Sequence, residues 1–310
     1  MSRCIPLVTV VTPSTLSVEP TLGSILQEHQ MPAIDYEFNK YHYLDDGGPN
    51  GPTPSVDRFM TGAIVQGSIP SLPVPAPNST YTLTFPGPLI QCRNSSSDIN
   101  QQVHNYMKER YIYSKTFVGF RPLTDNISHA MHTVLYGYAG PDNADRDADV
   151  AEKLIMSFWP YMPAYNRWVI ECGMYNASWT VSFDFTNGVQ STHIQDLRVL
   201  NRVRSYSQHA IPTPPNEDQL FAYSSLMTAF SDSFEGFCSS SMSICTDTKI
   251  YSSALINSKQ IWEIVFDEKV GNKSADTLPS ILDAAQELGR NITLSLYANP
   301  YFMYSPPLTP

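Results

Sequence analysis

The feature that most constrains the fold is a long alternation of apolar and polar residues in the middle of the chain. Apolar side chains take every second position in two runs, Trp168, Ile170, Cys172 and Met174, then Trp179, Val181, Phe183 and Phe185. Asn187-Gly188 follows, and both residues tolerate the positive φ of a two-residue hairpin turn. Leu197, Val199 and Val203 continue the apolar face. The pattern predicts a meander of three or four antiparallel strands, with a first turn at 175–178.

Weaker patterns predict the remaining elements. Alternation indicates strands at 80–85, 133–138, 249–255, 260–266 and 292–297. Helical spacing indicates helices at 96–111, from about 150, at 217–237 and at 279–289, with Ser97 or Asp98 as the first cap. Pro279 in the first turn and Gly289 at the end fit the last helix. The expected class is therefore α+β: β-rich, with antiparallel sandwich-like sheets and a few peripheral helices.

The chain divides unevenly along its length. Residues 1–58 read as an irregular N-terminal segment that packs on the body, because 45–52 is a cluster of Asp, Gly, Pro and Asn. Residues 59–310 read as one β-rich globular domain, which could break at the proline-rich stretch 211–216. A chain of 310 residues is long enough to bury a large core.

The charge balance excludes one class of partner. Charged residues make up 15% of the chain, and the net charge is −10. An acidic protein repels phosphate backbones, and no Lys/Arg stripe interrupts the sequence. We therefore expect no nucleic-acid partner, and neutral polar residues must supply much of the solubility.

Six N-glycosylation sequons point to a compartment. Their acceptors are Asn78, Asn94, Asn126, Asn176, Asn272 and Asn291. A sequon is used only in the secretory lumen and on exposed backbone. Asn78 precedes a predicted strand, Asn176 lies in a predicted turn, and Asn291 lies between a predicted helix and strand. These positions favour an extracellular or luminal glycoprotein; the alternative is an Asn/Ser/Thr-rich cytosolic surface.

Five cysteines leave one without a partner in an oxidising compartment. We expect Cys238 to pair with Cys245 across a short loop and Cys92 to pair with Cys172, a pairing that depends on the order of the strands; Cys4 is then free. No C-x-x-C motif indicates structural zinc or thioredoxin-like chemistry. The alternative is that all five are reduced and mostly buried.

The sequence shows no membrane-spanning helix. Residues 59–92 carry no charge, but six prolines between 70 and 88 forbid a continuous helix there. The apolar stretch 5–11 is short and holds Pro6, so it makes a poor signal peptide. We expect contact with a membrane only through segments that this chain does not contain.

No motif identifies catalysis, a cofactor or a metal. His129 and His132 have the spacing of two ligands on a helix, but no H-E-x-x-H pattern accompanies them. Asp145, Asp147 and Asp149 lack the Gly and Glu that an EF-hand loop needs, so an irregular calcium site at 142–147 or a solvated acidic loop remains.

Other candidates are also weak. Asp45-Asp46 lies in a turn and does not suit paired acids. No G-x-S-x-G elbow, P-loop or dinucleotide motif is present. The four tryptophans could stack on sugars, but Trp168 and Trp179 follow the apolar phase of their strands, which favours core packing.

Four stretches carry a resemblance to a known group: 5–18 (IPLVTVVTPSTLSV), 78–92 (NSTYTLTFPGPLIQC), 168–185 (WVIECGMYNASWTVSFDF) and 288–302 (LGRNITLSLYANPYF). They resemble the extracellular region of uncharacterised filamentous-fungal multi-pass membrane proteins. In that group, membrane helices precede the first stretch and follow the last, and neither is seen here. The resemblance implies no activity and no site residue.

These observations favour a glycosylated, non-catalytic extracellular domain of fungal type with a binding or sensing role. Its expected partner is a protein or carbohydrate ligand at the cell surface, and the two chain ends should then lie on the same side of the body. One alternative is a secreted enzyme, such as one of a fungal secondary-metabolite pathway. Another is a structural protein of the wall.

Overall fold

The computed structural model describes the elements of the chain in several separate stretches. These cover residues 36–38, 49–72, 77–110, 115–122, 127–136, 153–159, 168–203, 217–239, 244–258, 261–262 and 277–298. The predictions that concern Cys4, Asn126, Asn272, Asp45-Asp46, residues 142–149, the break at 211–216 and the two chain ends lie outside these residues.

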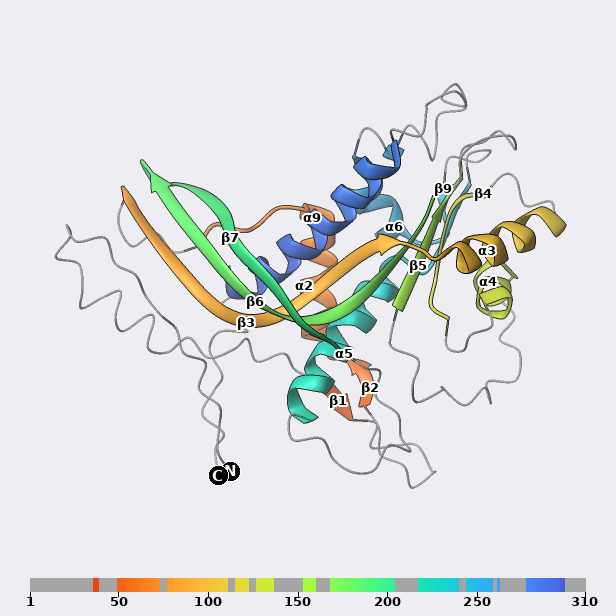
Figure 1. Ribbon diagram of the computed structural model, residues 1–310, viewed down its shortest axis with the longest axis horizontal. Helices are drawn as coiled ribbons and strands as arrows, with labels where there is room; N and C mark the ends of the chain where they lie inside the picture. Colours follow the sequence, from red (N-terminus) through yellow and green to blue (C-terminus); the bar gives the residue numbers. More distant parts are fainter. Residues whose placement is uncertain are drawn as a thin grey trace.

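One antiparallel sheet of seven strands organises the fold (Figure 1). Its strands are β3 (Ser79–Asn94), β4 (Lys115–Phe120), β5 (Lys153–Phe158), β6 (Trp168–Thr186), β7 (Val189–Arg202), β8 (Gly236–Ser239) and β9 (Ile244–Cys245). The order is β3-β6-β5-β4-β8-β9, and β7 also pairs with β6. A separate ribbon joins β1 (Tyr36–Phe38) to β2 (Pro49–Pro52). The long strands β3, β6 and β7 sweep through a strong curve.

Strand β6 pairs with three other strands of this sheet. One of its edges pairs with β3 over sixteen residues without a shift, from Ser79 opposite Phe185 to Asn94 opposite Ile170. Its other edge pairs first with β5 and then with β7. The hairpin turn between β6 and β7 is confirmed, with Asn187 at φ 53° and Gly188 at φ 79°. The turn predicted at 175–178 is wrong, because Asn176 is paired on both sides, with Pro88 and Asn201.

Seven helices accompany the sheet in the described residues. They are α2 (Pro54–Gln66), α3 (Ser97–Glu109), α4 (Ile127–Tyr136), α5 (Glu217–Asp232), α6 (Thr248–Ser252), α7 (Ala254–Asn257) and α9 (Thr277–Ala298). Thr53 caps α2 by accepting a hydrogen bond from the Val56 amide, and Ser96, not Ser97 or Asp98, caps α3 in the same way. The predicted helix at 217–237 ends earlier, and residues 236–239 form β8.

Three apolar cores lie on different parts of the sheet. The largest packs α2, α5 and α9 on the face of β6 that holds Ile170, Cys172 and Met174. A second core lies on the opposite face of the other half of β6, around Trp179, Val181 and Phe183. The third packs α3 and α4 against β4 and β5. Since β6 contributes side chains to all three, it ties the molecule together.

Helix α9 runs along the outer edge of β3 and satisfies its carbonyl groups. Tyr297 Oη donates to the Pro86 carbonyl at 3.0 Å, Thr293 Oγ1 to that of Pro88 at 2.8 Å, and Gln286 Nε2 to that of Cys92 at 2.9 Å. At Gly289 an added Cβ would lie 2.3 Å from the Ile90 carbonyl oxygen. These four carbonyls belong to alternate residues and therefore point to the same edge. The edge of β3 is thus covered by a helix.

Several predicted elements are wrong for identifiable reasons. Residues 292–297 are the end of α9 and not a strand. Their apolar residues alternate because this helix lies at a sheet edge and buries side chains on two sides, Ile292 and Leu296 in one core and Leu294 in another. Residues 153–158 are strand β5, with Met156 and Ile155 buried on opposite faces. The mixed helix-and-strand class is confirmed, while the sandwich is not confirmed, since one curved sheet dominates the described residues.

Three further strand predictions also differ. Residues 133–136 belong to α4, which packs between α3 and β4. Residues 248–257 form two short helices because Asp247 and Ser253 cap them through the amides of Lys249 and Ile256. Ile261 and Trp262 are helical, and the rest of 260–266 lies outside the described residues.

Candidate functional site

Two disulfides join neighbouring strands directly. Cys92 in β3 is opposite Cys172 in β6, and Cys238 in β8 is opposite Cys245 in β9. Both pairs are bonded, with Cα–Cα distances of 4.0 Å and 3.9 Å. Cys92, Cys172 and Cys238 are fully buried in the largest core. The presence of disulfide bonds in these two predicted pairs is therefore shown.

The sequon asparagines that the structure describes occupy two kinds of environment. Asn78 and Asn94 are exposed at the two ends of β3. Asn176 lies mid-strand in β6, half-buried, and its Oδ1 is buried without a hydrogen-bond partner. Asn291 lies inside α9, not between a helix and a strand, and donates from Nδ2 to the Gly67 carbonyl at 2.9 Å. Their glycosylation stays a prediction.

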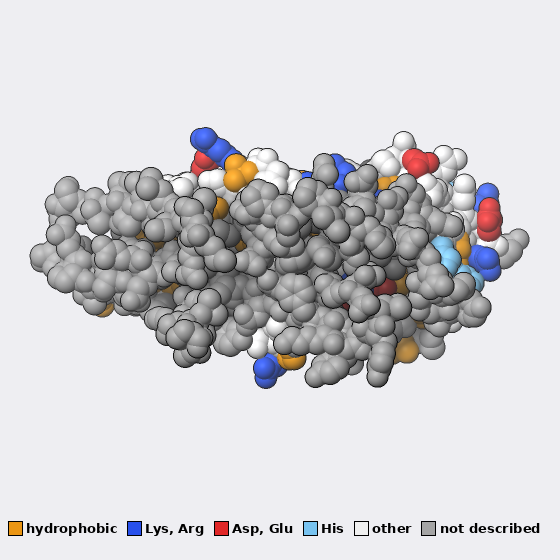
Figure 2. Space-filling model, turned by 90° about the horizontal axis from the view of Figure 1, so that it is seen from below, with side chains coloured by type: hydrophobic (Ala, Val, Ile, Leu, Met, Phe, Trp, Pro, Cys, Tyr) orange, Lys and Arg blue, Asp and Glu red, His pale blue; other side chains and the backbone are white. Residues whose placement is uncertain are grey.

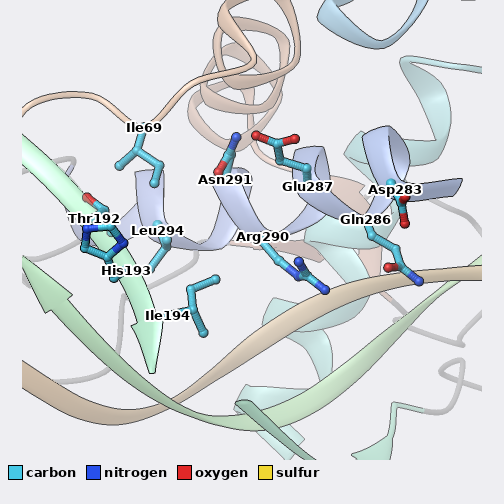
Figure 3. A pocket seen from close by; sticks show the side chains of 10 residues that line it. All are labelled: Ile69, Thr192, His193, Ile194, Asp283, Gln286, Glu287, Arg290, Asn291 and Leu294. Carbon is cyan, nitrogen blue, oxygen red and sulfur yellow. The ribbon is translucent and has the colours of Figure 1, made fainter. Parts of the chain in front are cut away.

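A groove of about 440 Å³ lies between α9 and β7 in the described residues (Figure 3). Helix α9 supplies one wall with Asp283, Gln286, Glu287, Arg290, Asn291 and Leu294. The facing wall is the stretch of β7 at Thr192, His193 and Ile194, and Ile69 closes one end. A volume of this size suits a small ligand.

The segment that follows α2, residues 67–72, bridges the two walls of this groove. On one side Asn291 Nδ2 holds the Gly67 carbonyl. On the other, the Leu72 amide donates to Gln190 Oε1 at 2.7 Å, and Gln190 Nε2 donates to Thr192 Oγ1 at 3.2 Å. Because both ends of the segment are hydrogen-bonded, Ile69 is held over the groove in a fixed place.

A serine, a histidine and an aspartate meet near the hairpin, but they are not arranged for catalysis. Ser191 Oγ lies 2.9 Å from His193 Nε2, and Asp184 Oδ2 lies 3.9 Å from the same nitrogen. A catalytic triad needs the acid and the nucleophile on different ring nitrogens. His193 is also 67% exposed in its side chain, so this cluster resembles ordinary surface polar contacts.

A buried carboxylate marks the junction where β6 changes partner from β5 to β7. Glu171 is 5% exposed and accepts a hydrogen bond from Arg93 at 2.9 Å, with Arg202 at 3.7 Å. The hydrogen bond from Arg93 to Glu171 raises the pKa of the arginine above its usual value. Since each charge here has a partner, the cluster reads as a structural ion-pair network.

The His129 and His132 pair, considered above as a weak metal candidate, gains no support in the described residues. His129 and His132 both lie on α4, and His132 Nδ1 is 2.9 Å from the Tyr106 hydroxyl. No group of three or more His, Cys, Asp or Glu with the geometry of a metal site occurs within the described stretches. Trp159, Trp168 and Trp179 are at most 4% exposed, so these three pack in the cores.

The surface charges are mixed in sign. On the face shown in Figure 2, the basic and acidic side chains of described residues lie scattered among one another. Among the helices described, none combines the length and hydropathy needed to cross a bilayer.

Comparison with known proteins adds no family to this geometry. No family model, curated protein or solved structure matches the chain significantly. The groove is therefore interpreted from its own residues.

The sequence analysis missed the groove. Asp283, Glu287 and Arg290 are spaced as on any exposed helix face, and β7 lies about ninety residues earlier in the chain. The one available signal was the run of charged residues on the last helix, which on its own indicates only a solvated surface.

Proposed function

We propose that the chain is a disulfide-bonded, N-glycosylated, non-catalytic extracellular domain of a fungal surface or membrane protein, with a binding or sensing role. The observation that carries the proposal is the pair of cross-strand disulfides. Disulfides persist in oxidising compartments and are rare in the cytosol. Asn78 and Asn94 support it, because both are exposed, as glycan acceptors must be.

The groove between α9 and β7 supports a binding role over a purely structural one. Its walls carry charged side chains, and hydrogen bonds within the chain hold the bridging segment in place. A preformed site of this kind loses little entropy when it is filled. We assign ligand binding to this groove, and we propose that the ligand is an extracellular molecule.

Expression in a eukaryotic secretory host tests the compartment. The secreted protein should lose apparent mass on treatment with an N-glycosidase, and the Asn78→Gln and Asn94→Gln variants should each lack one glycan. Blocking free thiols before reduction should leave four cysteines unmodified. A secreted, folded protein with no glycan at either asparagine, or with all its thiols reactive, would contradict the proposal.

A further inference from the structure

We propose that the groove binds a small zwitterion with an apolar body, of the size of an apolar amino acid or a short peptide. The proposal rests on the binding role given above and names the class of ligand. It follows from three properties of the groove: an unpaired cation, two unpaired carboxylates, and an apolar end.

The cation is Arg290. Its side chain is half-buried, yet it takes part in no hydrogen bond or ion pair within the part of the chain that the structure describes. Removing part of the water around a guanidinium costs free energy unless an anion takes the place of that water. Its fork of donors matches a carboxylate in a bidentate arrangement. The missing partner is therefore best supplied by a ligand carboxylate.

The acids are Glu287, three residues before Arg290, and Asp283, one turn further back. Both are exposed, and neither pairs with another charge in the described residues. Figure 3 shows Arg290 reaching from α9 toward the strands while Glu287 leaves the helix on the other side. The α9 wall of the groove thus presents a positive group and two negative groups, which project in different directions, to one ligand. A simple carboxylate would be repelled by the acids, whereas a zwitterion can satisfy both kinds of charge.

The third property is the apolar end. Leu294, Ile194 and Ile69 gather where α9, β7 and the bridging segment come together. Leu294 lies one helical turn beyond Arg290, about 6 Å along the axis, so a ligand carboxylate and an adjoining hydrocarbon chain can be held at once. Burying that chain adds affinity in proportion to its area.

Three probes separate the contributions: leucine, 4-methylpentanoate, which lacks the ammonium group, and isoamylamine, which lacks the carboxylate. Binding is measured by calorimetry on the purified full chain. Leucine should bind most tightly, and each analogue about tenfold or more weakly, as expected for loss of a charge-assisted contact. Leucyl-leucine serves as a longer zwitterion.

The variants assign each charge. Arg290→Gln should weaken the binding of leucine and 4-methylpentanoate about tenfold but should not weaken that of isoamylamine. Glu287→Gln should weaken the binding of leucine and isoamylamine about tenfold but should not weaken that of 4-methylpentanoate. Arg198→Gln is the matched control, since Arg198 lies on β7 outside the groove and pairs with Asp196 at 2.7 Å. Near-ultraviolet circular dichroism confirms that each variant is folded.

Two results would overturn the proposal. One is that neither leucine nor leucyl-leucine binds at concentrations up to about 10 mM, since a dissociation constant above that value is too weak for a ligand-binding site. The other is equal binding of leucine by the wild type and by Arg290→Gln. Both results leave the glycan and thiol measurements unaffected. A glycosylated protein that fails to bind refutes the groove assignment alone, and an unglycosylated protein that binds refutes the extracellular proposal alone.

Discussion

Gly289 sits where α9 comes closest to the sheet. A methyl group there would lie 2.3 Å from the Ile90 carbonyl oxygen, which belongs to the backbone of a strand paired along its other edge. Gly289→Ala should lower the free energy of unfolding by about 1–3 kcal/mol, the usual range for overpacking. Urea denaturation measures the change.

Gly62 provides the matched control, since it also lies inside a helix but an added Cβ meets nothing within 4 Å. Gly62→Ala should stabilise the protein by about 0.5–1 kcal/mol, because alanine loses less backbone entropy. The two substitutions should therefore have opposite signs. Equal effects would show that α9 does not approach β3 as described.

Tyr81 makes stability sensitive to alkaline pH. Its ring stacks on Phe183 and Phe185, and this burial raises the pKa of the phenol from 10.0 to about 12. Between these two values the folded state keeps a proton that the unfolded state releases, so stability falls as the pH rises above 10. The contribution is fully present below pH 10.

Replacing Tyr81 with Phe should therefore flatten the loss of stability between about pH 10 and 12. Burial also raises the pKa of Tyr297, so part of the loss of stability with pH should remain in this variant. Thermal melts at several alkaline pH values measure the effect. Tyr251→Phe, at a ring that is 41% exposed, is the control. An identical slope in wild type and Tyr81→Phe would contradict the packing of Tyr81.

Among the elements, the two disulfides differ in the length of chain that they close. Cys92 and Cys172 are 80 residues apart, and Cys238 and Cys245 only seven. Loop-closure entropy assigns about 4.5 kcal/mol to the long loop and about 2.4 kcal/mol to the short one. Replacing Cys92 and Cys172 by Ala should thus destabilise more than replacing Cys238 and Cys245. Guanidinium denaturation ranks the two double variants, and the reverse order would contradict the loop argument.

The sequence predicted best the elements that local pattern defines. The β6–β7 hairpin follows from alternation and Asn187-Gly188, and β3 follows from Tyr81, Leu83 and Phe85 against threonines. The end of α9 was misread, because its two buried sides imitate the period of a strand. The groove could not be predicted, since Arg290 on α9 and Ile194 on β7 are far apart in the sequence and come together only in the folded chain.

At the scale of the whole molecule, the shared strand β6 should make unfolding cooperative. Trp179 reports on one core, Trp168 on the largest and Trp159 on the third. All three cores include residues of β6, so the loss of one exposes the strand that supports the others. The structure therefore predicts a single transition.

Fluorine NMR of protein labelled with 5-fluorotryptophan tests this prediction, with each resonance assigned by a Trp→Phe variant. The native signals of the three tryptophans should disappear at the same urea concentration. If Trp179 loses its native signal well before Trp159, the two halves of the sheet unfold separately.

The cover that α9 places over β3 also has a consequence in time. Tyr297 follows Pro86 in the chain by 211 residues, so the ribosome adds it about 10–40 s later. Once β6 has paired with β3, the outer edge of β3 stays open until α9 has been made, and an open edge can recruit a neighbouring nascent chain. Pro86 and Pro88 are two of the four residues whose carbonyls face α9, and a proline has no amide hydrogen to offer a foreign strand. The two prolines whose carbonyls accept hydrogen bonds from α9 in the finished protein thus also protect this edge before α9 is made.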